Sequence, residues 1–283
     1  MIIVRIWEGL GNQLFQYSFA KALQLNTGQR VYLDISEYTR DVIREYNLCN
    51  FKISLPVIKG GKQIFNSIDG RDFYNVLRAD KDCSGYGFPM KFAKETNILF
   101  KPFLLNPSGN WYFKGWFQNE KYFAPYADVI RKELRPVNKI KIPSELKDIL
   151  DKAETVSVHF RRTDFQGDHN ILDLGYYRNA IRYIENKIKS PYYLVFSDDL
   201  EWVRQNVQFG SSCYFVNENR ELKDCEELLV MSRCRHNIIA NSTFSWWGAW
   251  LNDHAEKLVI APGKWFLNQN KKTDIVPKEW IRI

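Results

Sequence analysis

An apolar, β-branched run near the middle of the chain ends in a group of polar residues that are suited to chemistry. The run covers residues 156–160, and the polar group comprises His159, Arg161, Arg162 and Asp164. Such a run is typical of a buried parallel strand, and in open α/β sheets ligands bind beyond the carboxyl ends of the strands. A guanidinium is always charged and matches phosphate oxygens in a bidentate way, so the pair predicts an anionic ligand. An arginine pair that bridges to surface carboxylates is the alternative explanation.

A second polar cluster opens a predicted helix directly after another buried strand. It consists of Asn241, Ser242, Thr243, Phe244 and Ser245. Serine, threonine and asparagine are preferred helix caps, so a capped helix explains the cluster without a ligand. The amides and hydroxyls at the same helix end would also cradle a diphosphate, helped by the helix dipole. Both explanations stay open on the residues alone.

A third strand end carries Ser197, Asp198 and Asp199. The two carboxylates could bind ribose hydroxyls or guanine nitrogens. An Asp pair in this position more often caps the following helix, which is expected to begin near Leu200. Three polar strand ends that meet at one edge of a sheet would form a site.

The sequence favours chemistry that needs no metal. The four histidines, at positions 159, 169, 236 and 254, include no His-X3-His pair, and the cysteines show no paired short spacing. A departing diphosphate would then be stabilised by Arg161 or Arg162 and by helix amides instead of a cation.

These side chains must be positioned by an α/β scaffold. Residues 2–7 predict a first strand, and residues 14–25 predict a helix after a glycine-containing turn at residues 8–13. That turn is a ready ligand site, although its Gly-X-Gly is weak support for a dinucleotide fold. A strand at 30–35 would complete a β-α-β unit, whereas residues 36–97 show no sustained period and predict loops and short helices.

A segment rich in lysine and proline, residues 136–143, is the candidate linker between predicted domains at 1–136 and 144–283. Before it, a strand is expected at 110–116 and a helix at 122–134. After it, regular alternation predicts a doubly wound parallel sheet. The expected strands are 155–160, 192–196, 213–216, 237–240 and 258–261, and the expected helices are 144–152, 176–189, 200–207, 225–232 and 244–251.

Composition restricts the class of protein. The 283 residues are 45% hydrophobic and carry a formal net charge of +7, which predicts attraction to an anionic partner. The basic residues are scattered, which argues against a nucleic-acid groove. Five cysteines without framework spacing, and a first segment too quickly charged for a signal peptide, predict a cytoplasmic protein. Its charge would suit a peripheral contact with the inner membrane face, but no stretch approaches the roughly 20 apolar residues of a membrane span. The oligomeric state is not indicated.

Four segments together resemble the α-1,2-fucosyltransferases: residues 9–17, 159–164, 196–199 and 236–250. Two further segments, 114–123 and 175–177, also look like parts of that family. The matches keep their order from the first strand to about residue 265. The resemblance implies two Rossmann-like lobes of the GT-B kind with a cleft between them, an N-terminal lobe on the acceptor side and a C-terminal lobe that binds the nucleotide.

The family implies inverting transfer of L-fucose from GDP-fucose to the 2-hydroxyl of a terminal galactoside, in the synthesis of a surface glycan or oligosaccharide. GDP-fucose would be the donor substrate, a galactose-terminated glycan the acceptor, and neither a metal nor another cofactor is implied. A related GT-B transferase with another donor or linkage is the first alternative. The second is a nucleotide-sugar- or glycan-binding protein without turnover.

By resemblance, Arg161 contacts the β-phosphate and is the main catalytic residue, His159 faces the guanosine, and Asn12 lies near the reacting centre. Thr243, Phe244 and Ser245 would contact the diphosphate. The other expected donor-binding residues are Arg162, Ser197, Asp198, Glu227, Asn241 and Ser242.

The chain departs from the family pattern at two positions. Thr163 stands where glycine is usual, and Glu227 stands where an aspartate would bind guanine or ribose, with Asp224 as the alternative acid. No general base is evident. Asp164 is the nearest acid in its motif, although it could instead lock the arginine pair, and Glu8 is another candidate.

Overall fold

The computed structural model describes residues 1–39, 44–58, 91–95, 97–163, 170–219, 222–267 and 272–283. The chain divides into two compact units, Met1–Val137 and Asn138–Ile283. We call them the N-terminal unit and the C-terminal unit, and each is described by itself.

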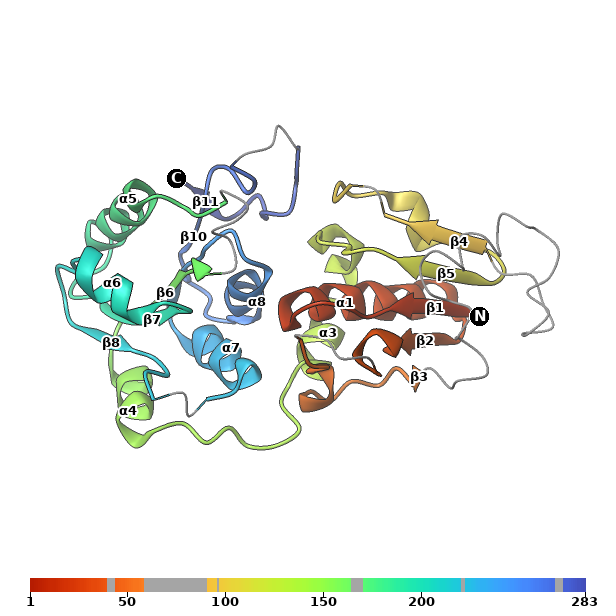
Figure 1. The fold of residues 1–283 in the computed structure, drawn as a ribbon, viewed down its shortest axis with the longest axis horizontal. Coiled ribbons are helices and arrows are strands. Elements are labelled where there is room, and N and C mark those ends of the chain that lie inside the picture. The colour runs from red at the N-terminus through yellow and green to blue at the C-terminus, as the bar shows by residue number, and fades with distance from the viewer. Residues whose placement is uncertain (40–43, 59–90, 96, 164–169, 220–221, 268–271) are drawn as a thin grey trace. The chain divides into compact units, whose positions relative to one another are not determined.

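The N-terminal unit is built on a parallel sheet with the strand order β3-β2-β1-β5-β4 over the described residues (Figure 1). The strands are β1 (Ile2–Arg5), β2 (Val31–Asp34), β3 (Val57–Ile58), β4 (Lys91–Lys94) and β5 (Trp111–Lys114). Helix α1 (Leu10–Thr27) packs on β1 and β2, and α3 (Ala127–Glu133) is a shorter helix. Single 3-10 turns connect these elements: Ser36–Thr39, Leu48–Asn50, Pro102–Leu105, Glu120–Tyr122 and Ala124–Tyr126.

The predicted first β-α-β unit is confirmed, with two differences in its boundaries. Helix α1 begins at Leu10 because Gly9 is its N-cap, so most of the predicted glycine turn is the first turn of the helix. The helix predicted at 122–134 shortens to α3, since Pro125 enters a 3-10 turn just before it. Strand β4 was not predicted. Residues 59–90, which belong to the segment 36–97 without a sustained period, lie outside the described residues.

The C-terminal unit has a second parallel sheet with the order β11-β10-β9-β6-β7-β8 in the part of the chain that the structure describes. Its strands are β6 (Thr155–Phe160), β7 (Tyr192–Ser197), β8 (Cys213–Phe215), β9 (His236–Ile238), β10 (Val259–Ala261) and β11 (Ile281–Arg282). Its helices are α4 (Ser144–Lys152), α5 (Leu174–Glu185), α6 (Leu200–Asn206), α7 (Asp224–Arg233) and α8 (Thr243–Leu251). The predicted alternation is confirmed, and β11 is an additional strand.

Side chains alternate between the two faces of this sheet, as the period of a strand requires. Tyr193 and Val195 of β7 belong to a core shared with α5, whereas Leu194 and Phe196 belong to a core shared with α4 and α7. Helices therefore cover both faces, which is the doubly wound arrangement.

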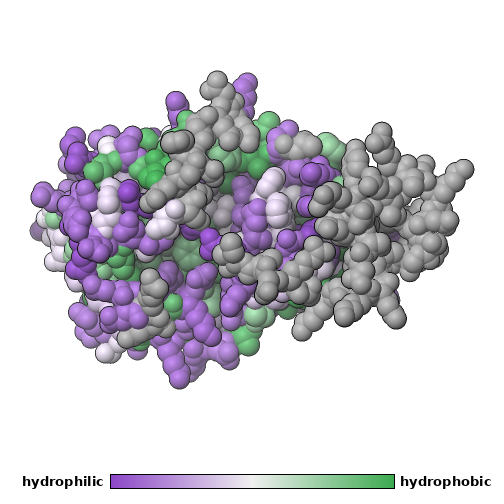
Figure 2. All heavy atoms as spheres, viewed as in Figure 1, coloured by the Kyte–Doolittle hydropathy of each residue, from purple (hydrophilic) through white to green (hydrophobic). Residues whose placement is uncertain are grey.

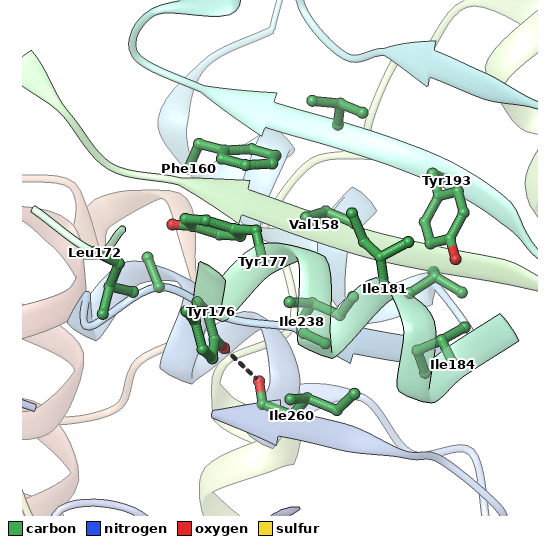
Figure 3. Packing of buried hydrophobic residues seen from close by; sticks show 14 of the residues in the cluster. Val158, Phe160, Leu172, Tyr176, Tyr177, Ile181, Ile184, Tyr193, Ile238 and Ile260 are labelled. Carbon is green, nitrogen blue, oxygen red and sulfur yellow. Dashed lines mark hydrogen bonds between the residues drawn. The ribbon is translucent and has the colours of Figure 1, made fainter. Parts of the chain in front are cut away.

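The core under α5 fixes the end of the central strand (Figure 3). Phe160 stacks on Tyr177 with ring centroids 4.1 Å apart, and the Tyr177 hydroxyl donates to the His159 carbonyl at 3.1 Å. The buried Tyr176 hydroxyl donates to the carbonyls of Ile239 and Ile260, at 2.6 and 3.2 Å. Two adjacent tyrosines thus connect α5 to three strand ends of the sheet.

The face of the C-terminal unit visible in Figure 2 is largely hydrophilic, with small hydrophobic areas between the polar side chains. Among the described residues, no helix has both the length and the hydropathy that crossing a membrane requires.

Candidate active site

The end of β6 and the start of α8 lie next to each other in the C-terminal unit. The His159 ring is 5.9 Å from the Phe244 ring, centroid to centroid, at an interplanar angle of 50°. His159 is buried, and Phe244 is half-buried. Two of the three polar strand ends predicted from the sequence are therefore brought together.

Asp198 connects the third strand end, that of β7, to the turn that follows β6. Its carboxylate accepts hydrogen bonds from the backbone amides of Arg162 and Thr163, at 2.9 and 3.0 Å, and from the Thr163 hydroxyl at 2.7 Å. The Arg161 Nε atom lies 3.8 Å from the same carboxylate. The side chain at the end of β7 thus fixes the turn at the end of β6. Thr163, the departure from the family pattern, supplies two of these bonds, and a glycine could not make the one from the hydroxyl.

The two adjacent arginines have different surroundings. The Arg162 guanidinium carbon lies 3.3 Å from the centroid of the Trp202 ring, and its Nε is 3.6 Å from an Asp199 carboxylate oxygen. These two contacts hold Arg162 against α6, and its predicted contact with the donor stays a prediction. The contact of Trp202 with Arg162 was not predicted from the sequence, because nothing in the segment around Trp202 indicates it.

Asp199 also caps α6, as the sequence led us to expect. Its carboxylate accepts from the Trp202 amide at 3.1 Å, and its own amide donates to the Ser197 hydroxyl at 2.9 Å. The capping explanation is confirmed for Asp199, and Ser197 supports the same turn.

The start of α8 is a capped helix, which confirms the plainer of the two explanations for this cluster. Ser242 is the N-cap and accepts from the Phe244 amide at 3.3 Å. The buried Asn241 donates to the carbonyls of Asn170 and Trp265, and the buried Ser245 hydroxyl donates to the Ser242 carbonyl. The half-buried members are Thr243 and Phe244. Contacts between this cluster and a diphosphate stay a prediction. A capped helix end can still bind an anion through its backbone amides.

Glu227 on α7 is held by Asn217, a residue that the sequence analysis did not single out. The Asn217 amide donates to the Glu227 carboxylate and also bonds the backbone of Leu222 on both sides, at 2.7 and 3.0 Å. Asn217 adopts a φ of 61°, a left-handed conformation that asparagine tolerates better than most residues. Burial raises the pKa of Glu227 to about 7, opposed by the Asn217 hydrogen bond and reinforced by the charge of Asp224. Asp224 itself is exposed at the helix start.

A pocket of about 570 Å3 lies beside the edge strand β8. Its lining includes Arg204, Tyr214 and Asn217, but none of the site residues predicted from the sequence. Because Asn217 also bonds Glu227, the pocket lies next to this one predicted donor-binding residue, which does not line it.

Asn12 belongs to a polar network inside the N-terminal unit. Its amide nitrogen donates to the Glu8 carboxylate at 2.5 Å, and its amide oxygen accepts from Gln118 at 2.7 Å. The Trp116 ring nitrogen donates to the same Glu8 oxygen at 3.0 Å. Trp116 and Gln118 lie in a segment that resembles the fucosyltransferases, but their roles were not predicted from it.

The structure does not test two of the predictions made from the sequence, the role of Asp164 and chemistry without a metal. Asp164 lies outside the described residues, so neither of its two suggested roles is tested. Among the residues whose positions are described, no three His, Cys, Asp or Glu side chains form a group that could hold a metal ion.

The family model that matches this chain is "Glycosyl transferase family 11", and it covers residues 91–283. The matched part includes the three strand ends and α8. The chain belongs to glycosyl transferase family 11. The family resemblance deduced from the sequence motifs is thereby confirmed, and the protein is a glycosyltransferase.

Similar proteins extend over nearly the whole chain. It is 30% identical to an alpha-1,2-colitosyltransferase of Escherichia coli, over 100% of this chain and 99% of the relative. It is 32% identical to the O-antigen biosynthesis glycosyltransferase WbnK of Escherichia coli, over 97% and 98%. A galactoside alpha-(1,2)-fucosyltransferase 1 of Plecturocebus brunneus is 23% identical, over 96% of this chain and 72% of its own.

A solved structure supports the fold of this family 11 glycosyltransferase. FUT1 of Arabidopsis thaliana, in complex with GDP, matches with a TM-score of 0.51 and 10% identity, over 91% of this chain and 69% of that one. Together with the two parallel sheets, this likeness confirms the α/β class with two Rossmann-like lobes.

Proposed function

We propose that this glycosyltransferase moves L-fucose from GDP-fucose to the 2-hydroxyl of a terminal galactoside, with inversion at the anomeric carbon. The observation that carries the proposal is the joining of three strand ends in the C-terminal unit, where Asp198 fixes the arginine turn and His159 lies beside Phe244 of α8. This collects a guanidinium and the amide end of a helix, the groups that suit a diphosphate.

In this mechanism Arg161 stabilises the charge that develops on the departing β-phosphate. The Arg161 Nε atom lies 3.8 Å from the Asp198 carboxylate, and by the family resemblance this arginine contacts the β-phosphate, whereas Arg162 is stacked on Trp202. The acceptor hydroxyl forms the new bond to the anomeric carbon while the bond from that carbon to the phosphate oxygen breaks, and GDP leaves with the electron pair. Stabilisation of developing charge by fixed donors is usually a large term in catalysis.

Donor recognition is assigned to the neighbouring residues. His159 and Glu227 would face the nucleoside, and Thr243, Phe244 and the helix amides would contact the diphosphate, with Ser197, Asp198, Asn241, Ser242 and Ser245 supporting them. Turnover needs no metal in this proposal, because the arginines and the helix end supply the positive charge. Activity should therefore survive EDTA, and complete loss that magnesium restores would contradict this part.

A panel of donors and acceptors tests the reaction. GDP should raise the thermal stability of the protein more than UDP does, and GDP-fucose with a panel of galactosides should give a product whose new bond NMR locates at the galactose 2-hydroxyl. A preference for UDP, or the absence of transfer from GDP-fucose, would contradict the proposed donor.

The two arginines provide a matched comparison. Arg161→Ala should lower kcat by about 100- to 1,000-fold while the affinity for GDP changes much less. Arg162→Ala should instead lower the free energy of unfolding by about 1–2 kcal/mol, because it removes the stack on Trp202. Near-normal turnover of Arg161→Ala would remove it from the catalytic role.

The similarity to a colitosyltransferase supports a second donor. Colitose is L-fucose without its 3-hydroxyl, and a site that hydrogen-bonds that hydroxyl would discriminate strongly against the sugar that lacks it. Direct competition between GDP-fucose and GDP-colitose, followed by analysis of the product, decides between them.

The acceptor is proposed to be a galactose-terminated surface glycan, a choice supported by the O-antigen glycosyltransferase among the relatives. The net charge of +7 would favour peripheral binding to anionic lipid on the cytoplasmic side, where nucleotide sugars are available. Co-sedimentation with vesicles that contain anionic lipid, at low and high salt, measures this contact.

A further inference from the structure

The positive charge of the chain lies almost wholly in the N-terminal unit. Residues 1–137 contain 19 lysines and arginines against 13 aspartates and glutamates, a net charge of +6, whereas residues 138–283 contain 21 against 20, a net charge of +1. The predicted phosphate-binding residues all belong to the nearly neutral unit, so the nucleotide does not account for the charge of the other one. A unit with an excess of this sign attracts an anionic surface.

Most of this excess lies in residues 91–135. This stretch has eight lysines and arginines against four aspartates and glutamates, and none of the eight basic residues is buried. The buried Glu95 carboxylate accepts from the backbone amides of Trp116 and Phe117, at 2.7 and 2.8 Å. The Glu133 carboxylate is ion-paired with a lysine of α1 at 2.9 Å. Because two of its acids are held inside the unit in this way, the surface of the stretch is more basic than its sequence indicates.

The same stretch carries an unusually exposed aromatic ring. Phe103, in the 3-10 turn Pro102–Leu105, is 73% exposed, more than any other large hydrophobic residue that the structure describes. The neighbouring Leu104 is buried, and its amide donates to the Lys101 carbonyl at 3.1 Å, so the turn is anchored beside the exposed ring. Single exposed apolar residues are ordinary, and the surroundings of Phe103 therefore decide what the ring can do.

Exposed apolar side chains also lie on the two elements that meet this turn. The Asn26 side chain, at the end of α1, donates to the Leu105 carbonyl at 3.5 Å and accepts from the Tyr126 hydroxyl. Leu25, next to Asn26, is 39% exposed, and Val129, three residues after Tyr126 on α3, is 38% exposed. Apolar groups from α1, α3 and the turn are therefore exposed on one part of the unit.

Two lysines flank the turn. Lys101 directly precedes it, and its amide donates to the Tyr122 hydroxyl at 3.0 Å. The Phe100 ring packs against the same tyrosine with centroids 4.9 Å apart, and the ammonium group of the exposed Lys121 lies 5.8 Å from the Phe100 centroid. Lysine stems can lie along apolar surface while the charged ends stay in a polar environment. Both charges thus belong to segments that pack beside the exposed ring.

We propose that the Phe103 surface, formed by Leu25, Lys101, Phe103, Lys121 and Val129, docks the N-terminal unit on an anionic lipid bilayer. The ring enters the headgroup region, and the two ammonium groups bind lipid phosphates. The aliphatic members of the surface offer no face on which a nucleic-acid base could stack, so lipid suits this combination of charge and apolar groups better. The proposal rests on the proposed function, whose lipid contact it assigns to one surface of the N-terminal unit.

Vesicle titration of the full chain, followed by sedimentation, tests the contribution of the ring. Vesicles of phosphatidylcholine alone are compared with vesicles in which about a third of the lipid is phosphatidylglycerol, at about 0.05 and about 0.5 M NaCl. Phe103→Ser removes the ring from an exposed position. Val137→Ser is the matched control, because Val137 is 52% exposed in the same unit but is not part of the Phe103 surface.

We expect the wild type to bind the anionic vesicles, and to bind them less at high salt. Phe103→Ser should lower the partition coefficient about 5- to 10-fold, because the ring no longer leaves water on docking. Val137→Ser should bind like the wild type. Thermal stability should be the same in all three proteins, since both substituted side chains are exposed.

A second pair of variants tests the charges. Lys101→Gln combined with Lys121→Gln should lower the partition coefficient on anionic vesicles about 10- to 30-fold at low salt and much less at high salt. The control combines Lys187→Gln with Lys189→Gln, two exposed lysines of the C-terminal unit. The two double variants have the same net charge, so a difference between them reports where the lysines lie.

Three results would overturn the proposal: a wild type that sediments with neither kind of vesicle, Phe103→Ser that binds like the wild type, or equal losses in the two double variants. Transfer is assayed separately, with a soluble galactoside and no vesicles, and all variants should keep the wild-type kcat. If the wild type transfers L-fucose but any of the three results is obtained, the docking surface is wrong and the proposed reaction stands. If vesicle binding depends on Phe103 but no GDP-sugar is a donor, the proposed reaction fails and the docking surface stands.

Discussion

At the scale of single residues, Glu227 couples the stability of the protein to pH. Its pKa of about 7 is above the ordinary value of 4.5, because burial penalises the charged form. A carboxyl whose folded pKa is raised contributes stability below its unfolded pKa and loses that contribution as the pH rises through the folded pKa. The wild type should therefore lose stability between about pH 5 and about pH 8 through this one group.

Glu227→Gln tests this coupling, since the Asn217 amide can donate to a glutamine oxygen as well. The variant should be more stable than the wild type at about pH 8, and the difference should shrink by about 1–3 kcal/mol on going to about pH 5. Chemical denaturation at the two pH values measures it, with the exposed Glu201→Gln as control. A difference that does not change with pH would mean that Glu227 is ionised throughout.

Residue types and spacing identified the strand-end groups because each stands beside a recognisable apolar run. His159, the arginine pair and Asp198 were found in this way, and the structure does bring their strand ends together. Trp202 and Asn217 could not be found, because each acts on a residue from another element. Contacts of that kind depend on tertiary packing, which local patterns do not record.

At the scale of elements, the turn after β5 connects Glu95 to the polar network of Glu8. Gly115→Ala should shift this turn, since its Cβ would lie 2.5 Å from the Glu95 Cβ and 2.8 Å from the Phe117 ring. We expect a loss of about 1–3 kcal/mol in the free energy of unfolding, together with a lower kcat.

Gly109→Ala is the control for that substitution. Gly109 precedes β5 with a φ of 87°, so alanine is strained there by about 1–2 kcal/mol, although nothing lies within 4 Å of its Cβ. Both variants should lose stability, but only Gly115→Ala should lose kcat when both are assayed well below their melting temperatures. Equal kcat in the two variants would show that the turn does not position Asn12, the residue of this network that the family resemblance puts near the reacting centre.

The elements themselves were predictable where the sequence repeats a clear period. The strands and helices after residue 144 alternate regularly, and the structure confirms them. Strand β4 was missed because Lys91–Lys94 has only four residues and no alternation, with two exposed lysines on either side of two half-buried residues. Strand β11 has only two residues, too few for any periodic signal.

At the scale of the whole molecule, the predicted phosphate-binding groups all belong to the C-terminal unit, whereas the Glu8 network belongs to the N-terminal unit. GDP should therefore slow the hydrogen exchange of backbone amides in the C-terminal unit and leave that of the N-terminal unit unchanged. We expect GDP to slow exchange in segments 158–163, 197–202 and 242–247, because ligand binding stabilises only the folded state of its own site. UDP at the same concentration is the control and should protect these segments less. Protection confined to residues 2–34 would place the nucleotide on the other unit, and Arg161 could then no longer be the group that receives the departing phosphate.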